Sequence, residues 1–250
     1  MNLFDRGSYV SFLIGRNSNL QASIFFFLSF LFGLNPGLIA QESEGIIKFQ
    51  PTWEGQALFL DSTVYLNKHQ AGIDIETFKL YISDIEFLHK DQVVYRLKKK
   101  HHLLDLEKPE SFSISLDNGP LIDADKIRFS LGIDSLTNVS GAFGGDLDPT
   151  NGMYWTWQSG YINLKIEGSS SLCPARHNRF QFHVGGYQQP FNSLRKLELA
   201  IADPEDIQVH IYLEQFIEAV DIQENYQVMS PNQQAIELAN LISSIFSTAK

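Results

Sequence analysis

Residues that could do redox or metal chemistry gather in the stretch GMYWTWQSGY, residues 152–161. Trp155 and Trp157, two of only three tryptophans, are two positions apart here, and Met153 precedes them at the same spacing. On an extended backbone, such residues point to one face. The spacing therefore predicts two indoles and a thioether side by side. This group could pack a core, because all three side chains are large and apolar, or it could serve a redox or metal site.

Histidine is the most probable source of soft-metal ligands, since the chain has a single cysteine, Cys173. One cysteine excludes internal disulfides and cysteine-based zinc or iron–sulfur centres. His183 and His210 each occupy the polar side of an alternating stretch, RFQFHV and IQVHIYL. Two glycines follow His183 and would let another group approach the backbone closely. A lone strand histidine is more often a hydrogen-bonded surface or edge residue, so both interpretations stay open.

Oxygen ligands of the kind that calcium prefers lie in GIDSLTNVSGAFGGDLDPTNG. Asp134, Asp146 and Asp148 are the three carboxylates of this stretch. The spacing is not that of an EF-hand, and aspartate also caps helices and turns. Calcium at these three residues is one hypothesis, and simple turn chemistry is the alternative.

Known catalytic patterns are absent from the sequence. It contains no GxSxG, HExxH, P-loop or CxxC motif and no visible pair of acid–base residues, which predicts a protein that is not an enzyme. The net charge of −10 argues against binding to a nucleic-acid backbone, which needs a basic face.

The first 40 residues have the layout of a cleaved export signal. The uncharged apolar run Ser23–Leu34 is too short to span a bilayer comfortably, Arg6 and Arg16 precede it, and Ala40 offers a small residue for cleavage before Gln41. We expect a periplasmic or secreted protein that keeps no stable membrane anchor after the signal is removed.

Alternation of apolar and polar residues dominates the rest of the chain, as in half-buried antiparallel strands. The pattern predicts a mainly β fold: a single antiparallel sandwich or curved, barrel-like domain over residues 41–225. In FKLYISDIEFL the alternation changes phase, which predicts a bulge near Ser83–Asp84. The expected strands are 46–50, 57–66, 73–88, 93–97, 101–105, 111–116, 127–133, 161–168, 179–184, 194–201 and 207–213.

A C-terminal helix is expected within residues 226–250. Ser230 as N-cap, Pro231 in the first position and Gln233 three residues after the cap predict a helix over 231–247. Its apolar stripe would cover the β domain.

Long, specific stretches of the chain resemble the MbnP-like family of copper-binding proteins, named for a protein encoded beside methanobactin genes. They are LGIDSLTNVSGAFGGDLDPTNGMYWTWQSGYINLKIEG and FQFHVGG, with FKLYISDIEF and HHLLDL upstream, so that the similarity covers roughly residues 45–215. The resemblance implies an exported, mostly β protein. It also implies that a dihaem, peroxidase-like partner enzyme oxidises a tryptophan to kynurenine, which holds copper together with histidines.

Carried over by position, Trp155 or Trp157 matches the family's tryptophan pair, and His183 matches the histidine after the F-x-F strand. Met153 would add a thioether, and His177 or His210 a second imidazole. The resemblance thus predicts an exported copper-binding protein. The alternative is a binding or structural module without copper, whose tryptophans pack the core or stack on a sugar or peptide.

Overall fold

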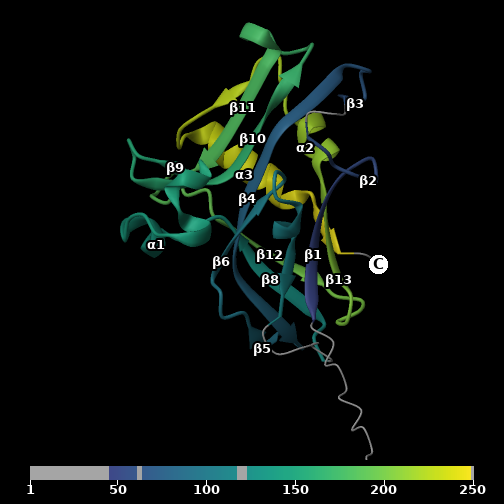
Figure 1. The fold of residues 1–250 in the computed structure, drawn as a ribbon, viewed down its shortest axis with the longest axis vertical. Coiled ribbons are helices and arrows are strands. Elements are labelled where there is room, and N and C mark those ends of the chain that lie inside the picture. Colours follow the sequence, from purple (N-terminus) through teal and green to yellow (C-terminus); the bar gives the residue numbers. More distant parts are fainter. Residues whose placement is uncertain (1–44, 61–63, 117–122, 249–250) are drawn as a thin grey trace, which may run out of the picture. The chain divides into compact units, whose positions relative to one another are not determined.

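The structure is a computed structural model of the 250-residue chain, and it describes residues 45–60, 64–116 and 123–248. The predicted export signal, residues 1–40, lies outside the described residues. From residue 45 onwards the chain is mainly strands, arranged in two sheets (Figure 1). The predicted mainly β fold with a C-terminal helix is therefore confirmed.

The larger sheet is organised around one long strand, β4, which spans Gly72–His89. Two strands that follow β4 in the sheet order carry the candidate site. Three short strands also pair with β4. The main order is β12 (Arg195–Ala200), β8 (Lys126–Leu131), β4, β10 (Gly160–Ser170), β11 (Arg179–Gly185) and β14 (Gln227–Val228). The additional strands are β3 (Val64–Leu66), β5 (Gln92–Arg96), β6 (His101–Asp105) and, against β10, β9 (Tyr154–Trp155).

The smaller sheet has the order β15 (Phe246–Thr248), β13 (Ile207–Tyr212), β1 (Ile46–Trp53) and β2 (Gln56–Ala57), with β7 (Ser113–Ser115) also on β1. Strands β1 and β13 are parallel, as are β11 and β14, so the expected antiparallel pattern is not universal. Parallel pairing is possible because each pair is distant in sequence and needs no tight hairpin.

Most predicted strands are present, but the single strand expected over 57–66 is wrong. The chain turns back at Glu54 and Gly55, both at positive φ, and β2 then pairs with β1. Strand β3 belongs to the other sheet, where it pairs with β4. A period-two pattern cannot distinguish one strand from two short strands in different sheets.

Strand β4 bends in its middle, as its phase change predicts. Asp84 has φ +51°, and the pairing of β4 with β8 shifts register between Ser83 and Glu86. The extra residue re-aims the following side chains, so Ile85 and Phe87 stay fully buried beyond the bend. The predicted bulge is confirmed.

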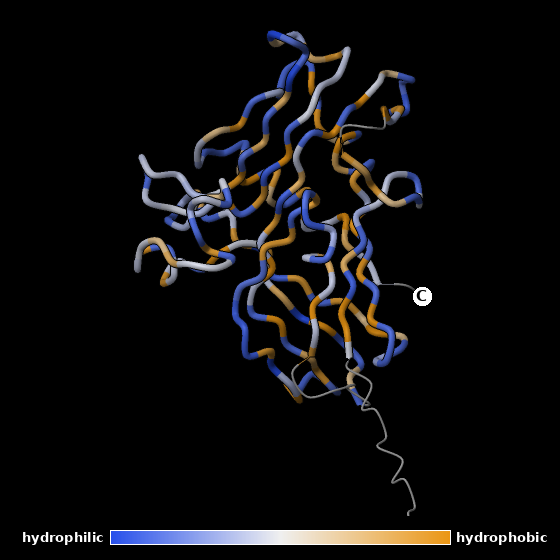
Figure 2. The backbone as a smooth tube through the Cα atoms, in the orientation of Figure 1, coloured by the Kyte–Doolittle hydropathy of each residue, from blue (hydrophilic) through white to orange (hydrophobic). Residues whose placement is uncertain are grey.

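Apolar side chains from both sheets form the main core, and Figure 2 shows hydrophobic and hydrophilic residues alternating along the strands. A second, smaller apolar cluster lies apart from it. That cluster comprises Tyr81, Leu103, Ile133, Leu147, Met153, Trp155, Tyr161 and Ile162, with Tyr154 packed against it. We call it the tryptophan cluster.

In the described residues three α-helices accompany the sheets: α1 (Ser135–Val139) and α2 (Leu213–Ala219), neither of which was predicted, and α3 (Gln233–Ser244). Helix α3 packs on β11 and β12. Asn232, not Ser230, is its N-cap and accepts a hydrogen bond from the backbone N–H of Ala235 at 2.8 Å. Across the three described ranges, no helix is long and apolar enough to cross a membrane.

Residues Phe246–Thr248 form strand β15 rather than the final helical turn that was predicted to reach residue 247. Strand β15 pairs with β13, and β14 pairs with β11. The part of residues 226–248 outside α3 is therefore built into both sheets.

Candidate functional site around the tryptophan pair and His183

The two tryptophans lie at a sharp hairpin that connects β9 to β10. Trp155 pairs with Gly160, and Ser159 in the intervening turn has φ +52°. The ring centroids of Trp155 and Trp157 are 5.7 Å apart, with an angle of 43° between the planes. The two rings are neighbours, but the strand ends between them. Trp155 is therefore buried, whereas Trp157 is 65% exposed.

Met153 shares the buried side with Trp155 rather than the exposed side with Trp157. Its side chain is fully buried inside the tryptophan cluster. The structure thus gives Met153 the role of filling the cluster beneath the indole, as the packing interpretation expected.

The ring of Trp155 lies directly on the backbone of β11 at Gly185. A Cβ atom on Gly185 would come within 2.6 Å of Cζ3 of Trp155, so no larger residue fits there without moving the ring. His183 is two residues earlier on the same strand and therefore faces the same side, with its Cα about 7 Å from that of Gly185. The expected close approach at the glycines after His183 is confirmed at Gly185.

Antiparallel pairing of β10 with β11 brings this arrangement together. His183 lies opposite Lys165, and its Nε2 is 2.7 Å from Oε1 of Glu167. The imidazole is only 6% exposed. Because an ionised carboxylate only accepts hydrogen bonds, the network assigns the proton to Nε2. In the neutral ring the lone pair is then on Nδ1, to which no described residue makes a hydrogen bond.

Glu167 is held in place by several neighbours besides His183. Gln181 donates to its Oε1 at 3.2 Å, Thr77 donates to its Oε2 at 3.4 Å, and the Lys165 ammonium is 3.8 Å away. The hydrogen bond from His183, aided by the Lys165 charge, lowers the pKa of Glu167 to about 2 against the opposing effect of burial. Metal-binding histidines commonly donate their second N–H to a carboxylate that is fixed in this way.

The two other histidines proposed from the sequence lie elsewhere. His177, at φ +59°, is in the turn before β11 and outside the strand that carries His183. His210 is in β13 of the smaller sheet, stacked on Tyr212 at 5.9 Å. Within residues 45–60, 64–116 and 123–248, no group of three or more His, Cys, Asp or Glu side chains could hold a metal.

The calcium hypothesis is not supported by the positions of the three aspartates. Asp134 caps α1 and Asp148 caps the following turn, each accepting the backbone N–H of a nearby threonine. Asp146 accepts the backbone N–H of Leu103 in β6 at 2.9 Å. Turn chemistry therefore accounts for Asp134 and Asp148, whereas Asp146 makes long-range contacts to β6 and to Lys99.

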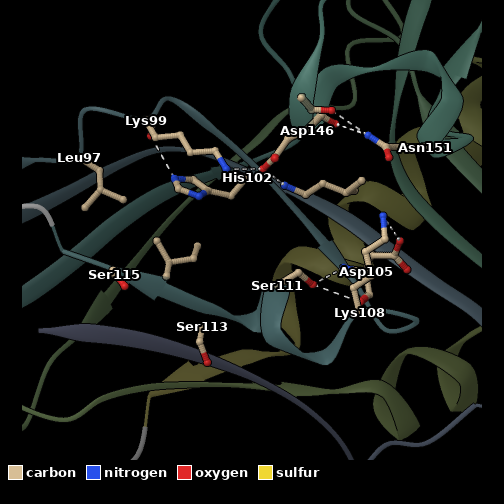
Figure 3. A pocket seen from close by; sticks show the side chains of 13 residues that line it. Leu97, Lys99, His102, Asp105, Lys108, Ser111, Ser113, Ser115, Asp146 and Asn151 are labelled. Atoms are coloured by element: carbon tan, nitrogen blue, oxygen red, sulfur yellow. Dashed lines mark hydrogen bonds and ion pairs between the residues drawn. The ribbon is translucent and has the colours of Figure 1, made fainter. Parts of the chain in front are cut away.

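A second buried histidine, His102, lines a polar cavity of about 480 Å³ that the sequence analysis did not anticipate (Figure 3). Its Nε2 donates to the carbonyl oxygen of Lys99 at 3.0 Å, and burial lowers its pKa to about 4. Close by, the Lys99 ammonium is paired with Asp146 at 2.8 Å. The sequence did contain one indication that His102 is buried, because it is two positions before Leu104 in HHLLDL and shares its strand face.

The fold and site define a class: a two-sheet, mostly β protein in which a carboxylate-held histidine lies two residues before a glycine that a tryptophan ring covers. The model of the MbnP family matches residues 42–230, and the chain belongs to this family of methanobactin-associated proteins. Among solved structures, MbnP from Methylosinus trichosporium is similar, with a TM-score of 0.59 and 15% sequence identity. The match covers 83% of this chain and 99% of that one and shows a shared fold. No curated protein sequence matches the chain significantly.

Proposed function

We propose that the chain is an exported, non-catalytic copper-binding protein whose metal site forms where His183 meets the Trp155–Trp157 pair. One tryptophan, oxidised to kynurenine, and the Nδ1 atom of His183 would supply ligands. The observation that carries the proposal is the orientation of His183, because Glu167 fixes Nε2–H and leaves the Nδ1 lone pair available, two residues before the glycine that the Trp155 ring covers.

The donor set fits a soft, low-coordinate metal better than a hard one. Neutral imidazole suits copper, whereas calcium and magnesium need several oxygen ligands, which this corner lacks among the described residues. The part played by the chain's own residues is to hold the imidazole in one tautomer and to place the Trp155 ring against β11.

Formation of kynurenine needs an external oxidant, for which the family resemblance suggests a dihaem, peroxidase-like partner. The exposure of Trp157 supports access by such an enzyme, while Trp155 is buried against Gly185, two residues after His183. Mass spectrometry of the protein from its natural host is the direct test: loss of one carbon and gain of one oxygen adds about 4 Da. Fragment ions of the 152–161 peptide then assign the change to one tryptophan.

Copper titration tests the metal site itself. Kynurenine-containing protein should bind copper, and the His183→Ala variant should not retain that affinity. Equal uptake by both proteins would remove His183 from the site. In the same preparation, N-terminal sequencing should start at or near Gln41, and retention of residues 1–40 would contradict export by a cleaved signal.

The alternative function, a binding module without copper, is favoured by one observation. The exposed indole of Trp157 borders a cavity of about 230 Å³ lined also by Tyr187, Phe191 and three glutamines. Aromatic rings and amides without charge are typical of surfaces that bind neutral sugars or peptides. Absence of kynurenine and of copper uptake, together with sugar binding lost in Trp157→Ala, would favour this alternative.

A further inference from the structure

The tryptophan pair connects a buried ring to the surface. Trp155 is 6% exposed, whereas Trp157 is 65% exposed, and their ring centroids are 5.7 Å apart. An oxidant that is too large to enter the fold can therefore contact Trp157, while Trp155 offers it almost no surface. Oxidation of Trp155 by such an oxidant needs a path for electrons to the surface, and Trp157 is placed to provide it.

Indole rings are suited to this role because they can lose an electron and keep their proton. The indole radical cation retains its N–H group, so an electron can pass between two indoles without any proton transfer. The separation of Trp155 and Trp157 is within the range of about 4.5–7 Å that is usual for interacting aromatic rings. Because electron transfer slows steeply with distance, two rings this close exchange an electron far faster than a buried ring and a distant oxidant.

The two buried tyrosines of the tryptophan cluster are poor electron donors by comparison. A phenol gives up an electron readily only if its proton leaves at the same time, which needs a base. The hydroxyl of Tyr81 donates instead to the carbonyl oxygen of Asp146 at 2.8 Å, and that of Tyr161 to the carbonyl oxygen of Leu147 at 3.1 Å. Burial also raises the pKa of both hydroxyls, so neither proton leaves easily. A missing electron is therefore retained by the indoles.

The third tryptophan, Trp53, provides an internal comparison. It is 4% exposed and thus about as buried as Trp155, but its ring stacks on Tyr65 at 4.8 Å. Tyr65 is itself buried, and its hydroxyl donates to the carbonyl oxygen of Phe59 at 3.1 Å. Two buried tryptophans of one chain therefore differ in their ring neighbour, which is an exposed indole for Trp155 and a buried phenol for Trp53.

We propose that Trp157 is an electron relay through which a one-electron oxidant at the surface oxidises the buried Trp155. In the first step the oxidant, for example the high-valent haem of a peroxidase, gains one electron and Trp157 becomes a radical cation. In the second step Trp157 regains an electron from Trp155, which becomes the radical cation. One electron moves in each step, and no bond is formed or broken.

The relay rests on the proposed function in one respect, the external oxidant. It then assigns kynurenine formation to Trp155, whose ring lies on Gly185 two residues after His183, and contact with the oxidising enzyme to Trp157. The electron transfer itself requires neither copper nor kynurenine, so it can be measured on the unmodified protein.

The test uses the unmodified full chain and tris(bipyridine)ruthenium(III), a bulky one-electron oxidant. A light flash generates it from the ruthenium(II) complex, with a cobalt(III) ammine as the electron acceptor. In air, a tryptophan radical that has lost its N–H proton to water adds dioxygen, so bound oxygen marks the oxidised ring. Fragment ions then give the extent of marking at each tryptophan. In the parent protein we expect oxygen at Trp157 and Trp155 and little at Trp53.

Trp157→Phe keeps an aromatic ring beside Trp155 but removes the relay, because this oxidant does not oxidise phenylalanine. Oxygen at Trp155 should then fall to the low level of Trp53. Trp157→Tyr should restore part of it, since an exposed phenol can release its proton to water. Tyr154→Phe is the matched control, because Tyr154 adjoins Trp155 in the chain but points to the opposite face of β9, and it should have no effect.

Thermal melts of each variant confirm that the fold is retained. Three outcomes would overturn the relay: equal marking of Trp155 in Trp157→Phe and in the parent, marking of Trp53 as strong as that of Trp155 in the parent, or marking of Trp157 alone in the parent. Failure of the proposed function is a separate result. It would appear as protein from the natural host that lacks kynurenine, while the relay variants still behave as expected.

Discussion

Two buried histidines of this protein, His183 and His102, have similar local geometry and different surroundings. Both are less than a tenth exposed, and both use Nε2 in a hydrogen bond, which assigns the lone pair to Nδ1. His183 bonds a carboxylate and lies on the strand face covered by Trp155. His102 bonds a backbone carbonyl, and the ammonium of Lys99 lowers its pKa further.

The difference shows that a fixed tautomer alone does not define a metal site. An ionised carboxylate on the far nitrogen strengthens an imidazole as a ligand, whereas a neutral carbonyl does so less. In the cavity of His102 the carboxylates Asp146 and Asp105 are paired with Lys99 and Lys108, so they serve the lysines rather than the imidazole. His183 is therefore the candidate ligand, and His102 is a structural histidine.

The largest expected effect is the loss of the protein's folding stability in acid that is caused by His102. The ordinary histidine pKa is 6.5, and burial holds the folded-state pKa at about 4. Between these values the unfolded chain binds a proton that the folded chain does not, so stability should fall as pH drops from 6.5 to 4. The loss should total about 3 kcal/mol.

Urea unfolding of His102→Gln at several pH values checks this, because glutamine keeps a donor for the Lys99 carbonyl without a titrating ring. The variant should lose less stability than the parent across that window, and the two should change in parallel above pH 7. If the two proteins lose stability in parallel over the whole pH range, His102 becomes protonated in the folded protein as it does in the unfolded chain. That result would weaken the contrast with His183.

The next effect is on copper. With kynurenine-containing protein, His183→Ala should lower copper affinity by about 100-fold, because a direct ligand is worth at least as much as an outer partner. His102→Ala is the matched control, another buried histidine with a free Nδ1, and should leave affinity unchanged. The measurement is a competition titration with a copper chelator. If His102→Ala lowers copper affinity and His183→Ala does not, His102 is the ligand and His183 is the structural histidine.

Gly185 tests whether the Trp155 ring must lie on β11. Gly185→Ala places a methyl group within 2.6 Å of the ring, so the indole must move or the strands must separate. We expect a loss of about 2 kcal/mol in unfolding free energy, typical of overpacking. Gly144→Ala is the control, because a Cβ there meets nothing within 4 Å. Similar stability of both variants would mean that the ring is free to relocate.

The sequence predicted most of the strands because apolar and polar residues alternate along them, as in IRFSLGI and YINLKIEG. It also predicted the bulge at Asp84, since a phase change in that alternation has few other causes. The separation of Trp155 from Trp157 could not be predicted, because i, i+2 spacing implies a shared face only while the strand continues. The strand ends at Trp155, and a tight turn follows.

Contacts between residues that are far apart in the sequence could not be predicted from the local pattern either. Nothing in RFQFHV indicates that Glu167 would face His183, because that contact depends on the register of β10 against β11. Local patterns thus identified His183 as a candidate, while tertiary pairing supplied the partner that distinguishes it from His102.

The smallest expected effect is the most specific test of that partner. Glu167→Gln keeps an oxygen that can accept from Nε2 of His183 but removes the negative charge, so copper affinity should fall about tenfold rather than vanish. Glu198→Gln is the control, since Glu198 pairs with Lys126 and Arg128 in the β8–β12 region. If Glu198→Gln lowers copper affinity as much as Glu167→Gln does, the effect comes from the change in net charge and not from the contact with His183.

A pH series gives this variant a second readout. The pKa of Glu167 is lowered from 4.5 to about 2, so its ionised form stabilises the fold fully above pH 4.5. That contribution is lost as pH falls from 4.5 towards 2, because the unfolded chain takes up a proton first. Glu167→Gln should lack this acid-sensitive part of the stability. If the variant also keeps full copper affinity, the carboxylate stabilises the sheet but does not prepare His183 for metal, and the main contrast with His102 disappears.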